Sequence, residues 1–335
     1  MKVLLAVYSP VSRLVCRVKR ELHKLGFGPA VRPPLPVLSV GNLAFGGSEK
    51  TPLAMALLQF LESLGRRPAL VSRGYRGQWE KRGGILSDGR KILGTWREGG
   101  DEPYLAALRY PRAGVFVGKN RAASCRRAFA AGFDVAVLDD GFQHLRLHRN
   151  LDIVLLDPER RTPLREGRSA LRSADIVLMR SENAPDAALP ETPNPRTAVF
   201  RYAVAADGVV PLRGGPRRSF ASLSDRRVLA FCGIARPNRF FGLLAENGVP
   251  PAARLSFPDH FDYPDRALDE IEAAARAAGC SVILTTEKDA VKVSGRLENR
   301  AGLDVLAASI RLVLPGGFFE AIQAALARNS DGREK

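Results

Sequence analysis

The chain has 335 residues, of which 45% are apolar and 26% are charged. This length is comfortable for two globular domains, and the composition excludes a repetitive or low-complexity chain. Lys and Arg outnumber Asp and Glu by 51 to 35, so the net charge is +16. Such a charge favours an anionic partner (nucleic acid, an anionic membrane or a phosphorylated substrate), although a basic surface can also serve solubility alone.

No segment of the sequence is typical of a secreted or membrane-spanning protein. The first apolar run ends at Ser9-Pro10, too early for a signal peptide, and no stretch reaches the roughly 20 apolar residues of a membrane helix. The cysteines are far apart, which indicates neither a zinc site nor a disulfide framework: Cys16, Cys125, Cys232 and Cys280. We therefore expect a protein of the cytoplasm.

The residues after Pro10 have the pattern of an amphipathic helix with two stripes. The apolar stripe consists of Leu14, Val18, Leu22 and Leu25, and the basic stripe consists of Arg13, Arg17, Arg20 and Lys24. A basic stripe beside an apolar one suits a helix that lies on an anionic membrane surface. The alternative is an ordinary surface helix that packs on the protein's own core, and on pattern alone this alternative is the commoner one.

Short apolar runs alternate with helical segments in the next part of the chain. The expected strands are 37–40, 69–72, 115–117, 135–138, 153–156 and 176–178, and the expected helices are 51–64, 102–108 and 121–131. Near-continuous apolar strands that alternate with helices predict a parallel sheet covered on both faces. The fold class is therefore α/β, with a mostly parallel sheet and helices on both faces.

The pattern changes at residues 197–213, where TAVFRYAVAADGVVPL predicts two strands joined by a turn at Asp207-Gly208. We interpret this β-hairpin as a linker between domains, because strand and helix alternation resumes after it. The expected organisation is an amphipathic helix at 1–28, a larger α/β domain at 29–196, the two-stranded linker at 197–213, a smaller C-terminal α/β domain at 214–328 and a disordered tail at 329–335.

The strongest chemical signal is SVGNLAFGGSEKTP at residues 39–52, where a strand leads through a glycine-containing loop to Lys50-Thr51 and a helix. Such a loop directs backbone N–H groups at phosphate oxygens, while its lysine neutralises them and its hydroxyl binds Mg²⁺. The match to the usual phosphate-binding loop is imperfect, because Ala44 and Glu49 occupy its glycine positions. Taken alone, the segment fits a glycine turn before a helix equally well.

A second segment supports nucleotide binding. DVAVLDDGFQH, residues 134–144, is an apolar strand that ends in the carboxylates of Asp139 and Asp140. Enzymes with a phosphate-binding loop (P-loop) hold Mg²⁺ with a carboxylate in such a place. A strand followed by a polar turn is the alternative, but the loop and the carboxylate pair in this order favour a P-loop nucleotide site.

With these motifs the sequence resembles the tetraacyldisaccharide 4'-kinase family, whose loop reads G-N-L-x-x-G-G-x-G-K-T-P. The chain matches every defined position of that loop except the glycine that Glu49 replaces. Further matching segments follow in family order and cover most of the chain: SRGY at 72–75, GDEP at 100–103, KNR at 119–121, LDDGFQH at 138–144, PLRE at 163–166, FPDH at 257–260 and TTEKD at 285–289.

The resemblance implies a P-loop NTPase-like fold and transfer of the γ-phosphoryl group of ATP, with Mg²⁺, to the 4'-hydroxyl of a lipid A disaccharide 1-phosphate. It implies two partners, the tetraacyldisaccharide 1-phosphate precursor and an anionic inner-membrane surface, and no nucleic acid. We expect a monomer that associates peripherally with the cytoplasmic side of the bacterial inner membrane. Since an acylated substrate stays in the bilayer, the resemblance favours the interpretation of the amphipathic helix at 1–28 as a membrane anchor.

The resemblance also assigns roles to single residues. Those implied in catalysis are Lys50, Asp101, Arg121 and His260, with Asp101 as the base and His260 as its partner from the other domain. The implied nucleotide-binding residues are Asn42, Gly46, Gly47, Ser48, Glu49, Lys50 and Thr51. The implied metal ligands are Thr51, Asp139, Asp140 and Glu102. The implied substrate-binding residues are Arg73, Gln143, Arg165, Glu166 and Asp259.

Several alternatives stay open. Asp101 precedes a helical segment and could be its N-cap. The carboxylate of Glu49 should repel the nucleotide unless it swings away or meets a cation, so the chain could be a weakened homologue in which Glu49→Gly strengthens ATP binding. A P-loop kinase or NTPase acting on a soluble small molecule is another interpretation. A nucleic-acid-binding protein fits the charge of +16, but no aromatic-interleaved basic motif or zinc-type spacing supports it.

Overall fold

The computed structural model describes residues 2–44, 49–157, 164–181, 192, 194–297 and 302–331. The chain divides into two compact units. The first unit is Met1–Ala203 with Leu312–Lys335, and the second unit is Val204–Arg311. The chain passes from one unit to the other within two strands, β8 (Ala198–Pro211) and β12 (Asp304–Val313).

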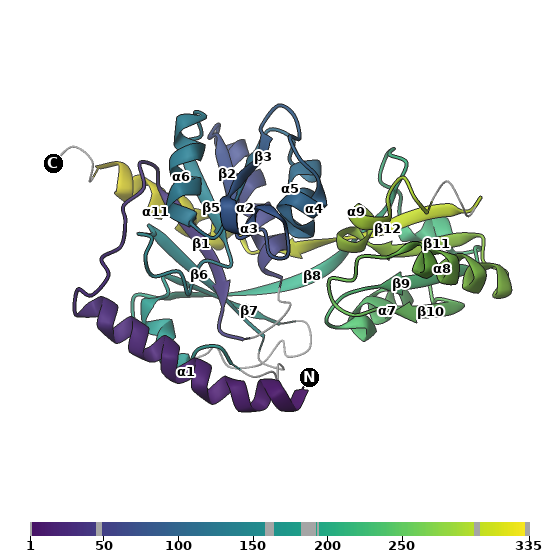
Figure 1. Cartoon of the computed structure of the whole chain (residues 1–335), viewed down its shortest axis with the longest axis horizontal. Coiled ribbons are helices and arrows are strands. Elements are labelled where there is room, and N and C mark those ends of the chain that lie inside the picture. The colour runs from purple at the N-terminus through teal and green to yellow at the C-terminus, as the bar shows by residue number, and fades with distance from the viewer. Residues whose placement is uncertain are drawn as a thin grey trace. The chain divides into compact units, whose positions relative to one another are not determined.

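The first unit alternates strands and helices, as the apolar runs predict (Figure 1). Its strands are β1 (Val37–Asn42), β2 (Pro68–Ser72), β3 (Gly84–Asp88), β4 (Gly114–Val117), β5 (Val135–Asp139), β6 (Leu151–Leu156), β7 (Ile176–Arg180) and the start of β8. Its helices are α1 (Lys2–Lys24), α2 (Lys50–Ser63), α3 (Trp79–Arg82), α4 (Trp96–Gly99), α5 (Asp101–Arg109), α6 (Arg121–Ala130), the 3-10 helix η1 (Arg168–Ser173) and α11 (Gly316–Asp331). Every strand and helix expected between residues 37 and 178 is confirmed.

The sheet of the first unit has the order β8-β7-β6-β1-β5-β2-β4-β3. Every neighbouring pair is parallel except β3, which runs antiparallel to β4 at the edge. β1, β2, β4 and β5 are buried at every residue, as strands covered on both faces are. On one face, Cys125 and Ala128 of α6 pack with Val71 and Ala136 of the sheet. The predicted mostly parallel sheet is therefore confirmed.

The strand order brings two loops to one place. β1 lies between β5 and β6, and Val40 of β1 pairs in register with Asp139 of β5. The two strands run in the same direction, so the loops that follow them leave the same edge of the sheet. The loop after β1 leads to Lys50 at the start of α2, and the loop after β5 begins with Asp140. A parallel sheet of this order therefore places both predicted motifs at one edge.

Helix α1, the long purple helix in Figure 1, is tied to the rest of the first unit through polar side chains. The Ser12 hydroxyl donates to the carbonyl of Arg165 at 3.2 Å, and the buried side chain of Arg20 pairs with Glu166. The apolar stripe faces outward instead: Leu14 is 62% exposed, and the other three stripe residues are exposed as well. The helix thus packs with a polar side inward, which contradicts the interpretation that its apolar stripe packs on the protein's own core.

The second unit is a smaller α/β sheet with helices on both faces. Its strand order is β10 (Ala253–Ser256), β9 (Val228–Cys232), β11 (Val282–Thr286), β12 and the end of β8. Its helices are the 3-10 helix η2 (Phe220–Leu223), α7 (Pro237–Glu246), α8 (Asp265–Ala277) and α9 (Glu287–Val293). Side chains alternate along β9, because Ala230 packs with Leu244 of α7 and Phe231 packs with Ile271 of α8. Each face of the sheet therefore has its own apolar core.

The β-hairpin expected as the linker is wrong. Residues 198–211 form one continuous strand, β8, rather than two strands joined at Asp207-Gly208. Gly208 has a φ of +114°, and a Cβ atom there would lie 2.4 Å from the carbonyl oxygen of Arg218. The Asp-Gly pair therefore marks a close approach of two backbone segments inside a strand, where only glycine fits, and not a turn.

The expected C-terminal boundaries also differ from the structure. The domain expected at 214–328 is shorter, because the second unit ends before α11 and that helix belongs to the first unit. There the Phe319 ring lies 4.7 Å from the ring of Phe60 in α2, measured between centroids. The tail expected at 329–335 begins as part of α11, which continues through Asp331, and the last four residues lie outside the described ones.

Candidate active site

Lys50, Thr51 and the two predicted metal-binding carboxylates meet at the edge where β1 and β5 end. Nζ of Lys50 lies 2.7 Å from Oδ1 of Asp140 and donates to Oδ1 of Asn42 at 3.3 Å. The Thr51 hydroxyl donates to Oδ2 of Asp139 at 3.2 Å. The structure therefore joins the loop residues and the strand-end carboxylates in one cluster, as the sequence predicts.

The two carboxylates have different electrostatic surroundings. Burial, followed by the charges of Glu102 and Asp140, raises the pKa of Asp139 to about 7. Burial acts in the same direction on Asp140, but the nearby Lys50 and Arg165 outweigh it and lower the pKa of that carboxyl. Nη1 of Arg165 lies 3.0 Å from Oδ2 of Asp140. Asp140 is thus an ionised partner of two cations, whereas burial and two neighbouring carboxylates disfavour the charged form of Asp139.

The oxygen atoms around Asp139 fit a magnesium ion. Its Oδ1 atom is buried and has no hydrogen-bond partner among the described residues, and the Thr51 hydroxyl lies beside its other oxygen. Mg²⁺ prefers oxygen ligands and usually binds one or two carboxylates, with phosphates and waters as its other ligands. Within the described ranges, no three carboxylate, imidazole or thiol groups converge into a closed metal cage. A metal ion here would therefore take further ligands from a nucleotide and from water.

Backbone geometry fixes the turn after β5. Asp140 has a φ of +53°, in the left-handed region that side chains other than glycine rarely adopt. Strained residues of this kind cluster at functional sites. The turn is also packed closely against β1, since a Cβ atom on Gly41 would lie 2.4 Å from the Cβ atom of Phe142. Only glycine fits at that position of β1, which brings the two strand ends together.

Glu49, which stands where the family loop has glycine, meets a cation. Its carboxylate accepts hydrogen bonds from Nη1 of Arg180 at 2.5 Å and from the Tyr202 hydroxyl at 3.1 Å. Burial, together with the charge of Glu49, raises the pKa of Tyr202, so its hydroxyl stays protonated as a donor. The other expected loop residues lie outside the described ones: Gly46, Gly47 and Ser48.

Arg121 is buried beside the carboxylate pair. It is the first residue of α6, and its Nη1 donates to the carbonyl of Gly118 at 3.0 Å. Its Nε is buried and has no hydrogen-bond partner in the part of the chain that the structure describes. Burial lowers the pKa of Arg121 while Asp140 raises it, and a guanidinium keeps its proton at neutral pH. One N–H group of this buried cation is therefore left unsatisfied by the described residues.

Asp101 and Glu102 begin the short helix α5. Gly100 occupies the N-cap position with a φ of +96°, so Asp101 is a buried first-turn residue and the N-cap interpretation is wrong. Oδ1 of Asp101 accepts the backbone N–H of Glu102 at 3.0 Å. Glu102 lies close enough to Asp139 for its charge to raise the pKa of that carboxyl. The helix start thus places a third carboxylate near enough to Asp139 for their charges to interact.

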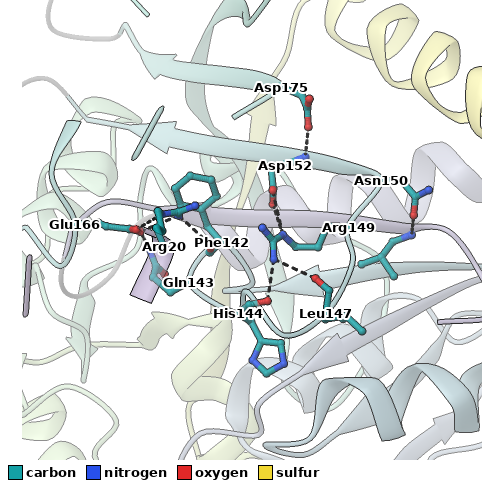
Figure 2. Close-up of polar contacts among 11 residues, drawn as sticks. Arg20, Phe142, Gln143, His144, Leu147, Arg149, Asn150, Asp152, Glu166 and Asp175 are labelled. Atoms are coloured by element: carbon teal, nitrogen blue, oxygen red, sulfur yellow. Dashed lines mark hydrogen bonds and ion pairs between the residues drawn. The ribbon is translucent and has the colours of Figure 1, made fainter. Parts of the chain in front are cut away.

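Gln143 and Glu166, both assigned to the substrate, lie in a buried network with Arg20 of α1 (Figure 2). Nη2 of Arg20 donates to Oε2 of Glu166 at 3.0 Å, and its guanidinium lies 4.3 Å from the centroid of the Phe142 ring. Nε2 of Gln143 donates to Oε2 of Glu166 at 3.1 Å and to the carbonyl of Asn42 at 2.8 Å. These contacts link α1, the turn after β5 and the end of β1.

A second network in Figure 2 braces the segment that follows Gln143. Arg149 donates from Nε to both carboxylate oxygens of Asp152, at 2.7 and 3.0 Å. Its Nη1 donates to the carbonyls of His144 and Leu147, at 2.8 and 3.2 Å. Burial, and then the charges of surrounding arginines, lowers the pKa of His144 to about 4, so this imidazole is neutral at pH 7. The turn that carries the carboxylate pair is therefore held from both sides.

Arg73 and Arg165, also assigned to the substrate, each have a carboxylate partner. Nε of Arg73 lies 2.6 Å from Oε1 of Glu80, and 48% of the Arg73 side chain is exposed. Arg165 is more buried and pairs with Asp140. Of the two, Arg73 has the more accessible cationic group.

In the second unit, His260 lies in a tightly held turn between β10 and α8. Its φ is +59°, and its Nε2 lies 3.1 Å from Nζ of Lys288. The same ammonium lies 3.6 Å from Oδ1 of Asp259. The rings of Phe257 and Phe261, which flank the turn residues in the sequence, stack on each other with centroids 5.0 Å apart. An imidazole and a carboxylate of this turn therefore meet an ammonium of helix α9.

Four partners in these clusters were not expected from the sequence. Lys288 lies in the TTEKD segment, whose match to the family is the signal that could have indicated it. Arg20 is expected only in a basic stripe of α1, and its buried contact with Glu166 is 146 residues away. Arg180 and Tyr202 have no local signal, since they contact Glu49 over separations of 131 and 153 residues.

Comparison with known proteins bears on the whole chain. A family model described as tetraacyldisaccharide-1-P 4'-kinase matches residues 1–327. The tetraacyldisaccharide 4'-kinase of Geobacter metallireducens is 38% identical over 333 residues, which cover 93% of this chain and 94% of the relative. The enzyme of that name from Anaeromyxobacter sp. (strain K) is 39% identical over 340 residues, which cover 94% of this chain and 88% of the relative.

A solved structure agrees with these relatives. The crystal structure of LpxK from Aquifex aeolicus in complex with ATP superposes with a TM-score of 0.78 at 28% sequence identity, covering 97% of this chain and 99% of that one. The likeness confirms the predicted fold class. Sequence matches over nearly the full length and this structural likeness together show that the chain belongs to the tetraacyldisaccharide-1-phosphate 4'-kinase family.

Proposed function

We propose that this protein transfers the γ-phosphoryl group of ATP to the 4'-hydroxyl of a tetraacyldisaccharide 1-phosphate, at the surface of the membrane that holds this lipid. Membership of the family supports the reaction. The observation that carries the proposal is the single cluster of Lys50, Thr51, Asp139 and Asp140 at one edge of the sheet.

The nucleotide half of the reaction follows from that cluster. Phosphoryl transfer depends mainly on positioning and on neutralisation of charge. Triphosphate oxygens bind the first-turn N–H groups of α2, and Lys50 exchanges its contact with Asp140 for the β- and γ-phosphates. Arg121 donates to the transferring group through its buried guanidinium. In this proposal the two cations neutralise the negative charge that develops on the transferring group.

Asp139, Asp140, Thr51 and Glu102 would hold a magnesium ion, through their oxygen atoms or through water. When bound, the ion neutralises the phosphate oxygens. The raised pKa of Asp139 supports this assignment, because a carboxylate that burial and its neighbours disfavour is stabilised by an incoming cation.

The acceptor half needs a base, because a sugar hydroxyl is a poor nucleophile. We assign this role to Asp101, which is buried at the start of α5 next to the proposed metal ligand Glu102. His260 is its proposed partner, which orients the carboxylate, while the charge of Asp101 raises the basicity of the imidazole. The left-handed backbone of His260 and its contact with Lys288 support a role for that turn beyond packing.

The remaining assigned residues fall into two groups, those with exposed polar atoms that suit substrate contacts and those whose polar atoms bind other protein groups. Arg73, with half of its side chain exposed, suits the 1-phosphate of the substrate, and Asp259 of the second unit suits a sugar hydroxyl. Arg165 contributes charge at the carboxylate pair. Gln143 and Glu166 are bound inside the protein, which supports positioning of the site as their role.

Helix α1 is the proposed contact with an anionic membrane. Its polar contacts face the protein, and its apolar stripe is exposed together with Arg13 and Arg17. Apolar area and basic residues both strengthen binding to an anionic surface, by about 1 kcal/mol for each basic residue near it. Among the described helices, none is long and apolar enough to cross a bilayer. Peripheral association at the cytoplasmic face suits a site that uses ATP.

The direct test gives the full-length protein Mg·ATP and two acceptors, the tetraacyldisaccharide 1-phosphate in mixed micelles and the same disaccharide phosphate without acyl chains. RNA is added separately as a binding control. We expect a second phosphate on the acylated acceptor alone, located at the 4' position by NMR. Asp101→Asn should abolish this product. A preference for the acceptor without acyl chains, or RNA binding with no turnover, would contradict the proposal.

Membrane association has its own test. Leu14→Asn with Val18→Asn removes exposed apolar area from α1 and leaves the Arg20 contact in place. The double variant should pellet less with phosphatidylglycerol vesicles than the wild type does. Phe129→Asn, at another exposed apolar residue of the first unit, is the control that should pellet as the wild type does. Equal pelleting of all three proteins would rule out α1 as the anchor.

A further inference from the structure

Glu49 presents a physical problem for a phosphate-binding helix. It is the N-cap residue of α2, and its carbonyl accepts the N–H of Leu53 at 2.9 Å. The first-turn N–H groups of such a helix are the groups that bind phosphate. A carboxylate at the N-cap can bind those groups itself, and it repels the phosphates by its charge. Glycine, which the family loop has at this position, does neither.

The structure holds this carboxylate in another direction. Among the described residues, the Glu49 side chain makes no capping hydrogen bond to α2. Its Oε1 atom accepts from Arg180 at the end of β7, and its Oε2 atom accepts from the hydroxyl of Tyr202 in β8. Both carboxylate oxygens are thus bound by donors of the sheet.

The ion pair of Glu49 and Arg180 is also well shielded from solvent. The side chains of Glu49 and Arg180 are only 16% and 12% exposed, and Tyr202 is 1% exposed. Salt screens such a pair much less than it screens a surface pair. Arg180 therefore cancels the charge of Glu49 at short range, and the rigid ring of Tyr202 fixes the direction of the carboxylate.

We propose that Arg180 and Tyr202 are positioning residues for nucleotide binding. They keep the carboxylate of Glu49 off the amino end of α2 and neutralise it, so that the helix N–H groups and Lys50 stay available to the phosphates. This inference rests on the ATP site proposed above. It replaces the expectation that Glu49 by itself makes a weakened homologue: the carboxylate is tolerated because its two partners accompany it.

The test measures equilibrium binding of a non-hydrolysable ATP analogue with Mg²⁺ to the full-length protein. Arg180→Met keeps the length of the side chain and removes its charge, and it should weaken binding by about tenfold or more. Tyr202→Phe keeps the ring and should weaken binding by about threefold. Glu49→Gln in the Arg180→Met background should restore binding to within about threefold of the wild type.

Two controls separate this role from a structural one. Arg66→Met removes a guanidinium that binds Asp134 at 2.9 Å, next to the opposite end of β5, and should bind the analogue as the wild type does. Denaturant unfolding of each variant shows whether it is folded. If Arg180→Met does not fold, the Tyr202→Phe change supplies the test, since it should weaken binding in the wild type and have no effect in the Glu49→Gln background.

The outcomes distinguish the inference from the proposed function. An Arg180→Met variant that binds normally, or a double variant that binds as weakly as Arg180→Met alone, would overturn the inference and leave the ATP site standing. A wild-type protein that does not bind Mg·ATP at all would overturn the proposed function and this inference with it.

Discussion

The two units contribute different kinds of site. In the first unit, Lys50 and Arg165 both bind Asp140, at strand ends that close backbone packing holds in place. In the second unit, His260 lies on a turn outside the strands and contacts Lys288 of helix α9. The sheet edge carries the cations and carboxylates that we propose for nucleotide binding, whereas the turn carries the imidazole that we propose as the partner of the base. The difference teaches that nucleotide binding and phosphoryl transfer should respond separately to substitutions.

The largest expected effect tests the first half of this comparison. Lys50→Ala removes a cation from the proposed phosphate site, and loss of one such group costs about 10³-fold in rate. We expect both ATP affinity and phosphorylation of the lipid acceptor to fall. Lys91→Ala, at an exposed lysine in the turn after β3, is the matched control and should keep full activity. Equal effects of the two substitutions would contradict the assignment of Lys50 to the phosphate site.

The second prediction tests the role proposed for the turn of the second unit. His260→Ala should lower kcat by about 10²-fold, the lower end of what an acid–base group contributes. The affinity for Mg·ATP should stay within about twofold of the wild type, because the nucleotide cluster lies in the first unit. Steady-state kinetics and analogue binding, measured on the same preparation, check this split. A loss of ATP affinity as large as the loss of kcat would break the comparison between the units.

The third prediction concerns how α1 supports the first unit. Arg20→Met leaves the buried carboxylate of Glu166 without its cation, and breaking a buried pair costs about 3 kcal/mol of unfolding free energy. Adding Glu166→Gln should recover most of that loss. Denaturant unfolding measures both, and Arg17→Met, at an exposed position of α1, should change stability by less than about 0.5 kcal/mol. If Arg20→Met were as mild as Arg17→Met, α1 would not be held by this pair.

The smallest expected effect is a pH dependence of stability at His144, in the segment that follows the carboxylate pair. Burial and neighbouring arginines lower the pKa of His144 to about 4, below its ordinary value of 6.5. The unfolded chain therefore binds a proton that the folded chain does not, so this histidine makes stability fall as the pH drops from 6.5 towards 4. At pH 5 its share is about 1 kcal/mol, allowing for partial solvent exposure. His144→Asn should lose less stability than the wild type between pH 7 and pH 5, and identical losses would contradict the lowered pKa.

The sequence could predict the parts of this protein that follow local rules. Apolar runs identify the buried strands of the first unit because parallel strands covered on both faces need apolar residues at nearly every position. Lys50 and Asp139 could be paired because the order of loop, strand and carboxylate is itself a pattern. Family resemblance added Asp101 and His260, which composition and spacing alone do not single out.

The rest depends on contacts that leave no local pattern. Asp207-Gly208 has the composition of a turn, yet the close approach of Arg218 uses the same glycine inside a strand. Likewise, Glu49 conflicts with the family loop until the structure supplies Arg180 from a distant strand. Local sequence rules fail at Glu49 because its compensating residues, Arg180 and Tyr202, lie more than a hundred positions away.

The most direct test is equilibrium binding of a non-hydrolysable ATP analogue, with and without Mg²⁺, to the wild type and to Asp139→Asn. The cluster of Lys50, Thr51 and Asp139 predicts that Mg²⁺ strengthens binding to the wild type and that Asp139→Asn removes at least tenfold of this gain, about 1.4 kcal/mol. Binding that depends neither on Mg²⁺ nor on Asp139 would contradict a shared metal and nucleotide site at this edge of the sheet.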